Sequence, residues 1–527
     1  MKQKLLSLCA MLLTLTLLTG CSDDSMKKIG SFLTGKEIET EEKTEEQPQE
    51  ESEMASEAVM SEAEAPDVLR LAYQETYGLN PFTTASLNNR TILSLLYEPL
   101  FVIDNHFQAE PVLATTVEVS EDGRTTTVSL RSDVRFHSGI AMTAGDVVYS
   151  YEQAKASSYY GNRFYHVESV EATDPHTIVI HTKLPYENVV LLFDFPIVHQ
   201  GTGEDPIPDG TGPFVYQDDY QLPRFEHWWR KNWTLDYDSA VLTPCSVATD
   251  IRDRFEYGEV NLVCTDPSSA AYATYHSDLE RWSAPTTIMQ YIGFNHNTKV
   301  FGIDAIRAAV TYAIDREAIV SEDLGGFGIP TTLPVSPLSP LYNPGLAADY
   351  DYDIDAFYSL LNTIEVEDYL SDGILDVYVK DYSVPIEGTM IVNSSSNQRV
   401  ATANRIAEVL RKVGFNITVK PLDEDEYRTA LKYQNFDLYF GEIRMSPNFD
   451  LGSFFRDYGS ANYGGTVSGN GVSLCSDMLE NSGNAYNLHK WVMDKGIICP
   501  ILFKSYAVYT ARGAAQNLNP ALDWVIH

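Results

Sequence analysis

The chain has 527 residues, of which 44% are hydrophobic and 21% are charged. It is too long for one compact core and too apolar to be disordered throughout, so two or three folded units are expected. Lys and Arg number 37 against 74 Asp and Glu, and the net charge of −37 excludes nucleic-acid binding as the leading interpretation, because such a surface repels phosphate backbones.

The first twenty residues have the pattern of a signal peptide. Lys2 and Lys4 precede an apolar stretch, Leu5 to Leu18, which is shorter than the ~20 residues that span a bilayer. It ends in Leu18-Thr19-Gly20-Cys21, which resembles a bacterial lipobox. That resemblance implies that Cys21 becomes a lipidated N-terminus, carrying palmitate or a similar acyl chain, and two or more chains anchor a protein stably. We therefore expect a lipoprotein on the extracytoplasmic side of the cell membrane; an ordinary cleavage site beside a cysteine is the alternative.

Residues 21–66 are expected to form an acidic, disordered tether. The stretch 36–67 contains 12 Glu and 1 Asp against 2 Lys and shows no apolar periodicity. Such a segment cannot bury enough apolar surface to offset its chain entropy, and its charges repel one another.

Folded structure is expected from about Asp67. Val68–Tyr73 alternates like a strand and leads into a loop at 75–86, after which a helix is expected from Asn88 or Asn89 to just before Pro99. Next, Thr115–Arg135 places turn residues between two β-rich runs, which predicts a hairpin. Thr143 and Asp146 then form a capping-box pattern that opens a helix.

Several collinear motifs carry a resemblance to a known family. Residues 117–152 (VEVSEDGRTTTVSLRSDVRFHSGIAMTAGDVVYSYE) resemble the signature segment of the family 5 extracellular solute-binding proteins, the oligopeptide, dipeptide and nickel receptors of ABC importers. Further motifs of that family stand in order along the chain: LYEPL at 96–100, VEATDPHT at 170–177, GTGPF at 210–214, YIGFN at 291–295 and IRAAVTYAIDR at 306–316.

The resemblance implies an α/β fold of the two-lobe periplasmic-binding-protein type, with an extra subdomain in lobe one. Lobe one is expected to take residues 67–293 and 501–527, and lobe two residues 294–500. The crossovers near Asn295 and Phe503 are then the hinge on which the lobes close over a solute.

The later elements also follow from local patterns. Apolar residues recur at helical spacing over Ile306–Ile319 and over Asn397–Val413, where Gly414 is placed as a cap. A strand at 415–419, a helix opening at Asp423 with Glu426, and a strand at 436–440 complete an alternating α/β unit. Because such units bind ligands where strands end and helices begin, the loops at 393–397 and 441–450 are indicated as ligand contacts.

The loop at 441–450 departs from the family pattern. Peptide receptors of the family carry an acidic residue before a proline here, which pairs with the amino group of the peptide. Arg444 and Met445 stand before Pro447 instead, so Glu442 or Asp450 could replace that carboxylate. Alternatively, the planar fork of Arg444 could hold a ligand carboxylate. An Arg444 with a purely structural role is the third possibility.

The expected ligand-binding residues combine these loops with the loop after the first strand and with the expected hinge strand. They are Tyr77, Asn80, Tyr291, Asn295, Asn397, Arg444, Asn448 and Asp450. In the strand Tyr291–Asn295 one set of alternating side chains is expected to face the cleft. The many aromatic residues, 32 Tyr and 22 Phe, suit a pocket for an organic ligand.

These features predict a substrate-binding lipoprotein that captures a peptide-like or other small organic solute and delivers it to an ABC permease and its ATPase subunits. No catalysis, cofactor, metal or nucleic acid is expected, because metalloprotease and nucleophile-elbow motifs are absent from the sequence. The alternatives are a cell-surface adhesion or sensory lipoprotein, which would show a filled cleft and an exposed apolar patch, a nickel-chelate receptor, and a glycan hydrolase. After processing, Cys245, Cys264, Cys475 and Cys499 remain, either as disulfides of undetermined connectivity or as free thiols.

Overall fold

The computed structural model describes residues 68–231, 237–276, 279–457, 459–464, 468–514 and 518. The expected signal peptide (1–20), Cys21 and the acidic segment (21–66) lie outside the described residues, as does most of the stretch after 514. Within the described ranges, no helix has the length and apolar character needed to cross a membrane.

A mixed sheet of ten strands runs through the described part of the chain, in the order β17-β16-β18-β11-β19-β10-β1-β9-β8, with β12 beside β19. Its strands are β1 Val68–Tyr73, β8 Gln221–Pro223, β9 Ser239–Pro244, β10 Leu262–Thr265, β11 Leu279–Phe294, β12 Gly328–Pro330, β16 Glu387–Asn393, β17 Asn416–Leu422, β18 Leu438–Arg444 and β19 Ile498–Ala511.

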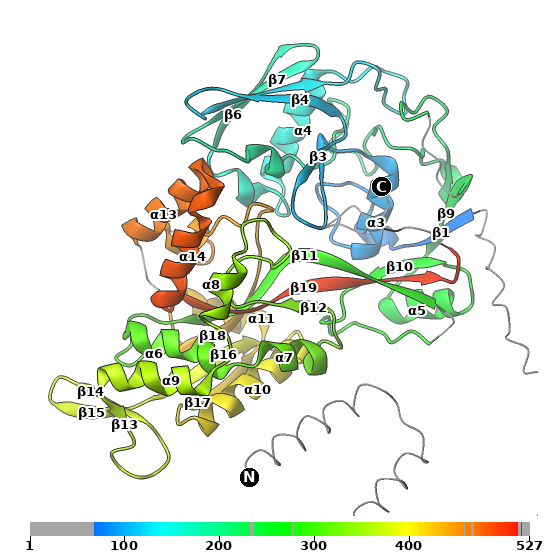
Figure 1. Ribbon diagram of the computed structural model, residues 1–527. Helices are drawn as coiled ribbons and strands as arrows, with labels where there is room; N and C mark the ends of the chain where they lie inside the picture. The colour runs from blue at the N-terminus through cyan, green and yellow to red at the C-terminus, as the bar shows by residue number, and fades with distance from the viewer. Residues whose placement is uncertain are drawn as a thin grey trace, which may run out of the picture. The chain divides into compact units, whose positions relative to one another are not determined.

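The two longest strands, β11 and β19, connect the two halves of this sheet (Figure 1). They pair antiparallel along most of their length, and the register shifts between Pro285 and Met289. In the half of the sheet that contains the start of β11, the other edge of β19 pairs with β10. In the half that contains the end of β11, the other edge of β11 pairs with β18. Two large hydrophobic clusters pack against the sheet. One joins Leu71 and Leu242 of the first half to Ile391 and Tyr439 of the second, and the other contains Ile292 and Met390.

Helices flank the sheet and join its parallel strands. β16 leads through α10 to β17, and β17 leads through α11 to β18; β16 pairs parallel with both β17 and β18. The α-helices are α3 Leu87–Leu96, α4 Ala144–Ala156, α5 Ala248–Glu256, α6 Asp304–Ala309, α7 Arg316–Asp323, α8 Pro344–Ala348, α9 Ile354–Leu361, α10 Asn397–Lys412, α11 Glu424–Lys432, α12 Gly452–Phe455, α13 Gly469–Glu480 and α14 Ala485–Asp494. The predicted α/β class is confirmed.

Three smaller sheets complete the architecture. One has the order β4-β5-β7-β6 and packs against α4. Their strands are β2 Phe101–Ile103, β3 Ala109–Pro111, β4 Ala114–Val119, β5 Thr125–Leu130, β6 Val167–Asp174, β7 Thr177–Thr182, β13 Val366–Glu367, β14 Asp376–Val379 and β15 Tyr382–Pro385. Short 3-10 helices lie at Glu75–Tyr77, Gly161–Phe164, Val189–Leu192, Asp218–Tyr220, Val310–Ala313, Asn362–Ile364 and Ser482–Asn484.

Most locally encoded elements form as expected. The strand at 68–73 and the hairpin β4–β5 are confirmed. Thr143 and Asp146 form the capping box of α4, since the Asp146 carboxylate accepts from the Thr143 amide at 2.8 Å. Ser396 caps α10 and Asp423 caps α11. The helix expected from Asn88 or Asn89 begins at Leu87 instead, because Ser86 accepts from the Asn89 amide and is its cap.

Other predicted bounds are also wrong, and the strand expected at 415–419 runs from Asn416 to Leu422. The helix expected over 306–319 is broken: α6 ends at Ala309, a 3-10 turn follows, and α7 begins at Arg316. The break comes from Asp315, which takes an extended backbone and accepts a hydrogen bond from the Ala318 amide as a cap. The strand expected at 436–440 runs instead from Leu438 to Arg444, so Arg444 is its last residue and lies opposite Ile288 of β11.

Cys245, Cys264, Cys475 and Cys499 are buried, and none of the four forms a disulfide. Of the two alternatives left open by the sequence, disulfides or thiols, the structure shows thiols. Burial raises the pKa of Cys245 to about 11 and the pKa of Cys475 well above its usual value.

Candidate ligand-binding cleft

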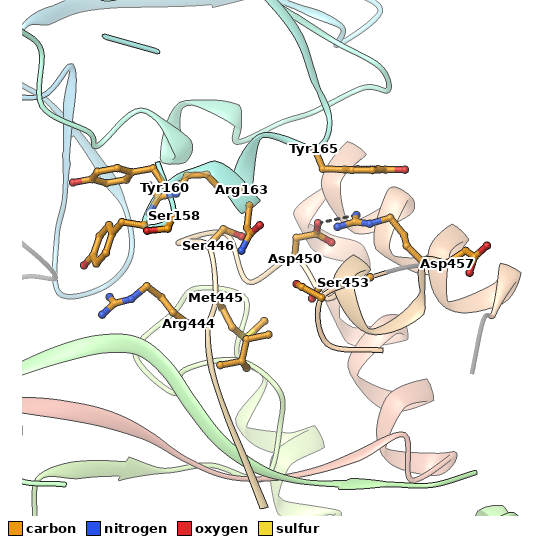
Figure 2. Close-up of a pocket in the computed structure, with 16 residues that line it drawn as sticks. Ser158, Tyr160, Arg163, Tyr165, Arg444, Met445, Ser446, Asp450, Ser453 and Asp457 are labelled. Carbon is orange, nitrogen blue, oxygen red and sulfur yellow. Dashed lines mark hydrogen bonds and ion pairs between the residues drawn. The ribbon is translucent and has the colours of Figure 1, made fainter. Parts of the chain in front are cut away.

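A cavity of about 420 Å³ lies between two distant parts of the chain, residues 158–165 and residues 443–460 (Figure 2). Its side chains are mostly polar, cationic or aromatic. They belong to Ser158, Tyr159, Tyr160, Asn162, Arg163, Tyr165, Ile443, Arg444, Met445, Ser446, Asp450, Ser453, Arg456, Asp457, Gly459 and Ser460. The volume is within the ~300–1,000 Å³ typical of small-molecule pockets.

The first side of the cavity is held by an aromatic cluster. Residues 158–165 follow α4, and Phe164 in their midst is buried against Tyr151 and Phe193, with ring centroids 5.2 and 6.2 Å apart. This packing fixes the backbone of the segment, and Tyr159, Tyr160, Arg163 and Tyr165 beside it line the cavity; Figure 2 shows the segment above the end of β18.

The second side is the end of β18 and the loop leading to α12. Phe449 in this loop has a positive φ of 54°, and its buried ring packs edge-on against Phe107 and Phe503 at 4.9 and 5.4 Å. A bulky residue in the left-handed region needs such packing to hold it there. The packing thereby fixes the loop on both sides of Phe449, including Asn448 and Asp450.

Three arginines face the cavity. Arg444 is half-buried, donates to the Tyr506 hydroxyl at 2.9 Å and lies 4.6 Å from the ring centroid of Tyr159. Arg163 pairs with the buried carboxylate of Asp194.

The third arginine, Arg456, joins the two sides of the cavity. Its guanidinium lies 3.9 Å from the ring centroid of Tyr165, 3.5 Å from an oxygen of Asp450 and 3.2 Å from Nε2 of His166. Burial lowers the pKa of His166, and the charge of Arg456 adds to this while Asp450 opposes it. Arg163 and Arg456 are thus paired with carboxylates, whereas Arg444 contacts a tyrosine hydroxyl and a tyrosine ring. A guanidinium in such surroundings is suited to a carboxylate or another planar anion.

The structure brings three of the predicted site residues to this region. Arg444 and Asp450 line the cavity, and Asn448, in the same loop, lines the next one. Asn448 is buried and donates to the Tyr186 hydroxyl through its side-chain amide.

The other predicted residues do not line this cavity. Tyr77 and Asn397 are exposed. Asn80 is buried, and its amide donates to the carbonyls of Gly203 and Asp205 at 2.8 Å each.

Tyr291 and Asn295, expected to face the cleft from the hinge strand, are buried. Tyr291 packs against Tyr439 with ring centroids 5.7 Å apart. Asn295 donates to two backbone carbonyls, those of Gln434 and Phe436, at 3.1 and 3.0 Å. Hydrogen bonds and burial of this kind hold elements together and leave little of either side chain accessible.

A second cavity, of about 190 Å³, shares the loop 445–450 with the first. Backbone contacts across the two halves border it: the Glu187 amide donates to the Leu479 carbonyl at 2.8 Å, and the Ser482 amide donates to the Glu187 carboxylate at 2.6 Å. Burial raises the pKa of Tyr186 far above its usual value, with help from the charge of Asp450, so the phenol stays neutral.

A buried lysine connects the two halves of the large sheet. Lys504 on β19 is 3% exposed and contacts Asp266, just after β10, at 2.6 Å and Glu442 on β18 at 3.3 Å. Burial acts to lower the pKa of Lys504, but the two carboxylates outweigh it and raise the pKa. Gln290 on β11 donates to Glu442 at 3.0 Å and extends the cluster.

Sequence reasoning missed the first side of the cavity and Arg456. A signal was present, since Tyr159, Tyr160, Arg163 and Tyr165 stand within seven residues directly after a predicted helix. Arg456 gave none, because its contact with His166 joins residues 290 positions apart.

Several known proteins resemble this chain in sequence. Residues 108–465 match the model of the bacterial extracellular solute-binding proteins, family 5. The glutathione-binding protein GsiB of Salmonella typhi is 25% identical over 291 residues, which cover 52% of this chain and 57% of that protein. The GsiB of Escherichia coli O1:K1 is 26% identical over 277 residues, 49% of this chain and 54% of that protein. The chain therefore spans little more than half the length of these relatives.

Solved structures show the same architecture. The oligopeptide-binding protein AppA of Bacillus subtilis, in complex with a nonapeptide, has a TM-score of 0.60 at 20% identity and covers 87% of this chain and 97% of its own. A nickel ABC transporter structure from Bacillus halodurans has a TM-score of 0.69 at 18% identity, covering 87% and 98%. These likenesses confirm the predicted two-lobe fold.

Proposed function

The chain belongs to the bacterial extracellular solute-binding proteins of family 5, and on that premise we propose that it captures a short peptide-like solute bearing a free carboxylate and delivers it to an ABC permease. The cavity carries this proposal, because three arginines and several tyrosines converge in it from two halves of the fold. The names of the relatives and of the solved structures, which refer to glutathione, a nonapeptide and nickel, are consistent with a small polar cargo.

Arg444 is the residue we assign to the solute's carboxylate. Arg444 is the last residue of β18, which pairs parallel with β16, and ligands of α/β folds bind beyond the carboxyl ends of such strands. Tyr159 packs over its guanidinium from the opposite side. Asp450 and Asn448 contribute polar contacts from the following loop. Tyr77, Asn80, Tyr291, Asn295 and Asn397 do not contact the solute in this proposal.

We place the two lobes at residues 67–293 with 501–527 and at residues 294–500. We keep the hinge at the crossovers near Asn295 and Phe503. The two register shifts of β11 against β19, between Pro285 and Met289 and between Gln290 and Tyr291, support bending there, because a break in strand pairing lets two long strands flex without losing the pairs on either side. The contacts of Arg456 with Tyr165 and His166 would then form on closure.

Attachment to the membrane is assigned to Cys21. The Leu18-Thr19-Gly20-Cys21 motif supports lipidation, and residues 21–66 would hold the binding lobes away from the membrane on the extracytoplasmic side. Changing Cys21 to Ser should release the protein from membranes while leaving solute binding unchanged; a variant that still fractionates with membranes contradicts this assignment.

Titration calorimetry tests the solute class, with glutathione, triglycine and nickel–histidine as probes. A desolvated, charge-assisted pair at Arg444 makes Arg444→Ala cost about 2–5 kcal/mol of affinity, and Arg444→Lys should recover part of it. Arg252→Ala, which removes an arginine of α5 paired with Asp253, is the matched control. Peptide binding within twofold of wild type in Arg444→Ala contradicts the assignment of Arg444.

The same titrations test the alternatives. Binding of nickel–histidine alone would favour a chelate receptor, and no binding of any probe would favour the adhesion or sensory role. The open cavity of about 420 Å³ supports the receptor over a protein with a filled cleft.

A further inference from the structure

The loop 445–450 separates two compartments between the halves of the fold. Ser446 and Asp450 line the larger, arginine-bearing cavity, whereas Pro447 and Asn448 line the smaller one. A solute that passes this loop would therefore reach both compartments. The hydrogen bond between the Asn448 amide and the Tyr186 hydroxyl lies at the boundary and is buried.

The smaller compartment differs from the larger in chemistry. No arginine, lysine, aspartate or glutamate side chain is among the residues that line it in the described part of the chain. Its sides are largely apolar, and Phe107, Leu191, Met478 and Leu479 are all buried there.

Both halves of the fold contribute to this compartment. Phe107 and Leu191 belong to the first half of the chain, and Met478 and Leu479 to α13 in the second. The Glu187–Leu479 and Glu187–Ser482 hydrogen bonds hold the two sides together. A group enclosed here would lose its contact with water when the two sides meet, and apolar surface gains most from that step.

We propose that the smaller compartment receives an apolar side group of the same solute whose carboxylate is held at Arg444, so that the receptor selects amphipathic peptide-like anions over wholly polar ones. This inference rests on the proposed function and adds a specificity to it. A charged group in this compartment would lose its hydration and meet no side chain of opposite charge among the described residues that line it.

The test compares two tripeptides with the same charged termini, triglycine and trileucine, on the full chain by titration calorimetry. Burial of one leucine side chain predicts that trileucine binds at least tenfold more tightly than triglycine. Leu191→Trp fills the compartment from one side and should reduce this ratio to less than twofold, with triglycine affinity unchanged.

Met478→Ala provides a second, milder variant in case the tryptophan does not fold. It removes an apolar contact from the opposite side and should weaken trileucine threefold or more while leaving triglycine within twofold. Equal affinity of the two peptides for wild type, or equal losses in the variants, would overturn this inference and leave the proposed function standing. Binding of neither peptide would overturn this inference, and absence of glutathione binding in addition would refute the proposed function.

Discussion

The buried carboxylate of Glu98 makes the stability of this protein depend on pH. Glu98 is 6% exposed and accepts hydrogen bonds from the indole nitrogens of Trp228 at 3.2 Å and Trp229 at 2.9 Å. Burial raises the pKa of Glu98 to about 7, and the Trp229 hydrogen bond and the charge of Arg230, which favour the ionised form, offset only part of this effect.

The difference in bound protons between the folded and unfolded chains sets the direction in which the free energy of unfolding changes with pH. Between the ordinary pKa of 4.5 and the folded pKa of about 7, the unfolded chain has lost the Glu98 proton and the folded chain keeps it, so the free energy of unfolding falls as the pH rises. At about 1.4 kcal/mol for each pKa unit, raising the pH from 5 to 8 should cost roughly 2–3 kcal/mol through this group. Glu98→Gln carries no such proton and should lack this contribution.

Urea denaturation followed by tryptophan fluorescence, at pH 5 and pH 8, measures the effect. The difference in unfolding free energy between wild type and Glu98→Gln should shift by roughly 2–3 kcal/mol between the two pH values, in favour of the variant at pH 8. Glu110→Gln, at an exposed carboxylate that lines the same cavity of about 100 Å³ as Glu98, is the matched control. A wild type–Glu98→Gln difference that does not change with pH would refute the reasoning.

Three further predictions concern stability. Within the described residues neither ring nitrogen of the fully buried His489 has a hydrogen-bond partner, and burial lowers its pKa to about 4. His489→Leu should therefore raise the free energy of unfolding by about 1–3 kcal/mol. It should also remove the loss of stability that wild type shows as the pH falls from 6.5 toward 4. An added Cβ at Gly293 would lie 2.1 Å from a buried tyrosine ring, so Gly293→Ala should lower the melting temperature, whereas Gly469→Ala, with open space around it, should not. Lys504→Met should lower the free energy of unfolding by about 2–3 kcal/mol in chemical denaturation, because it leaves the carboxylates of Asp266 and Glu442 without their shared cation. Adding Asp266→Asn should restore part of this loss. Free-energy changes of the two substitutions that simply add would contradict the coupling.

Elements encoded by a few neighbouring residues were predictable from the sequence. The capping box of α4 and the caps of α10 and α11 depend on residues three positions apart, so the pattern and the structure agree. The helix over 306–319 was not predictable in the same way, because apolar spacing continues through the break. Only Asp315, as a cap in the middle of the pattern, distinguishes two helices from one.

The candidate site was predictable on one side only. The rule that ligands lie beyond strand ends led to the loop after the predicted strand at 436–440. Two of its residues, Arg444, which proves to be the last residue of β18, and Asp450, do line the cavity. The opposite side depends on tertiary packing, since Arg456 meets Tyr165 and His166 only when two distant segments come together. For Tyr291 and Asn295 the strand alternation was a poor guide, because both faces of β11 are covered at this point.

The four buried thiols can serve as natural probes of local opening of the structure to solvent. They are distributed over separate elements: Cys245 follows β9, Cys264 lies in β10, Cys475 in α13 and Cys499 in β19. Alkylation requires an exposed thiolate, so each cysteine should react only when its own element opens to solvent. The rate of iodoacetamide labelling at each site, read by peptide mass spectrometry, would then rank the local opening free energies of four regions in one experiment without any introduced probe. Peptide added before labelling should slow Cys475 more than Cys245, because α13 lines the smaller compartment, whereas β9 lines neither cavity.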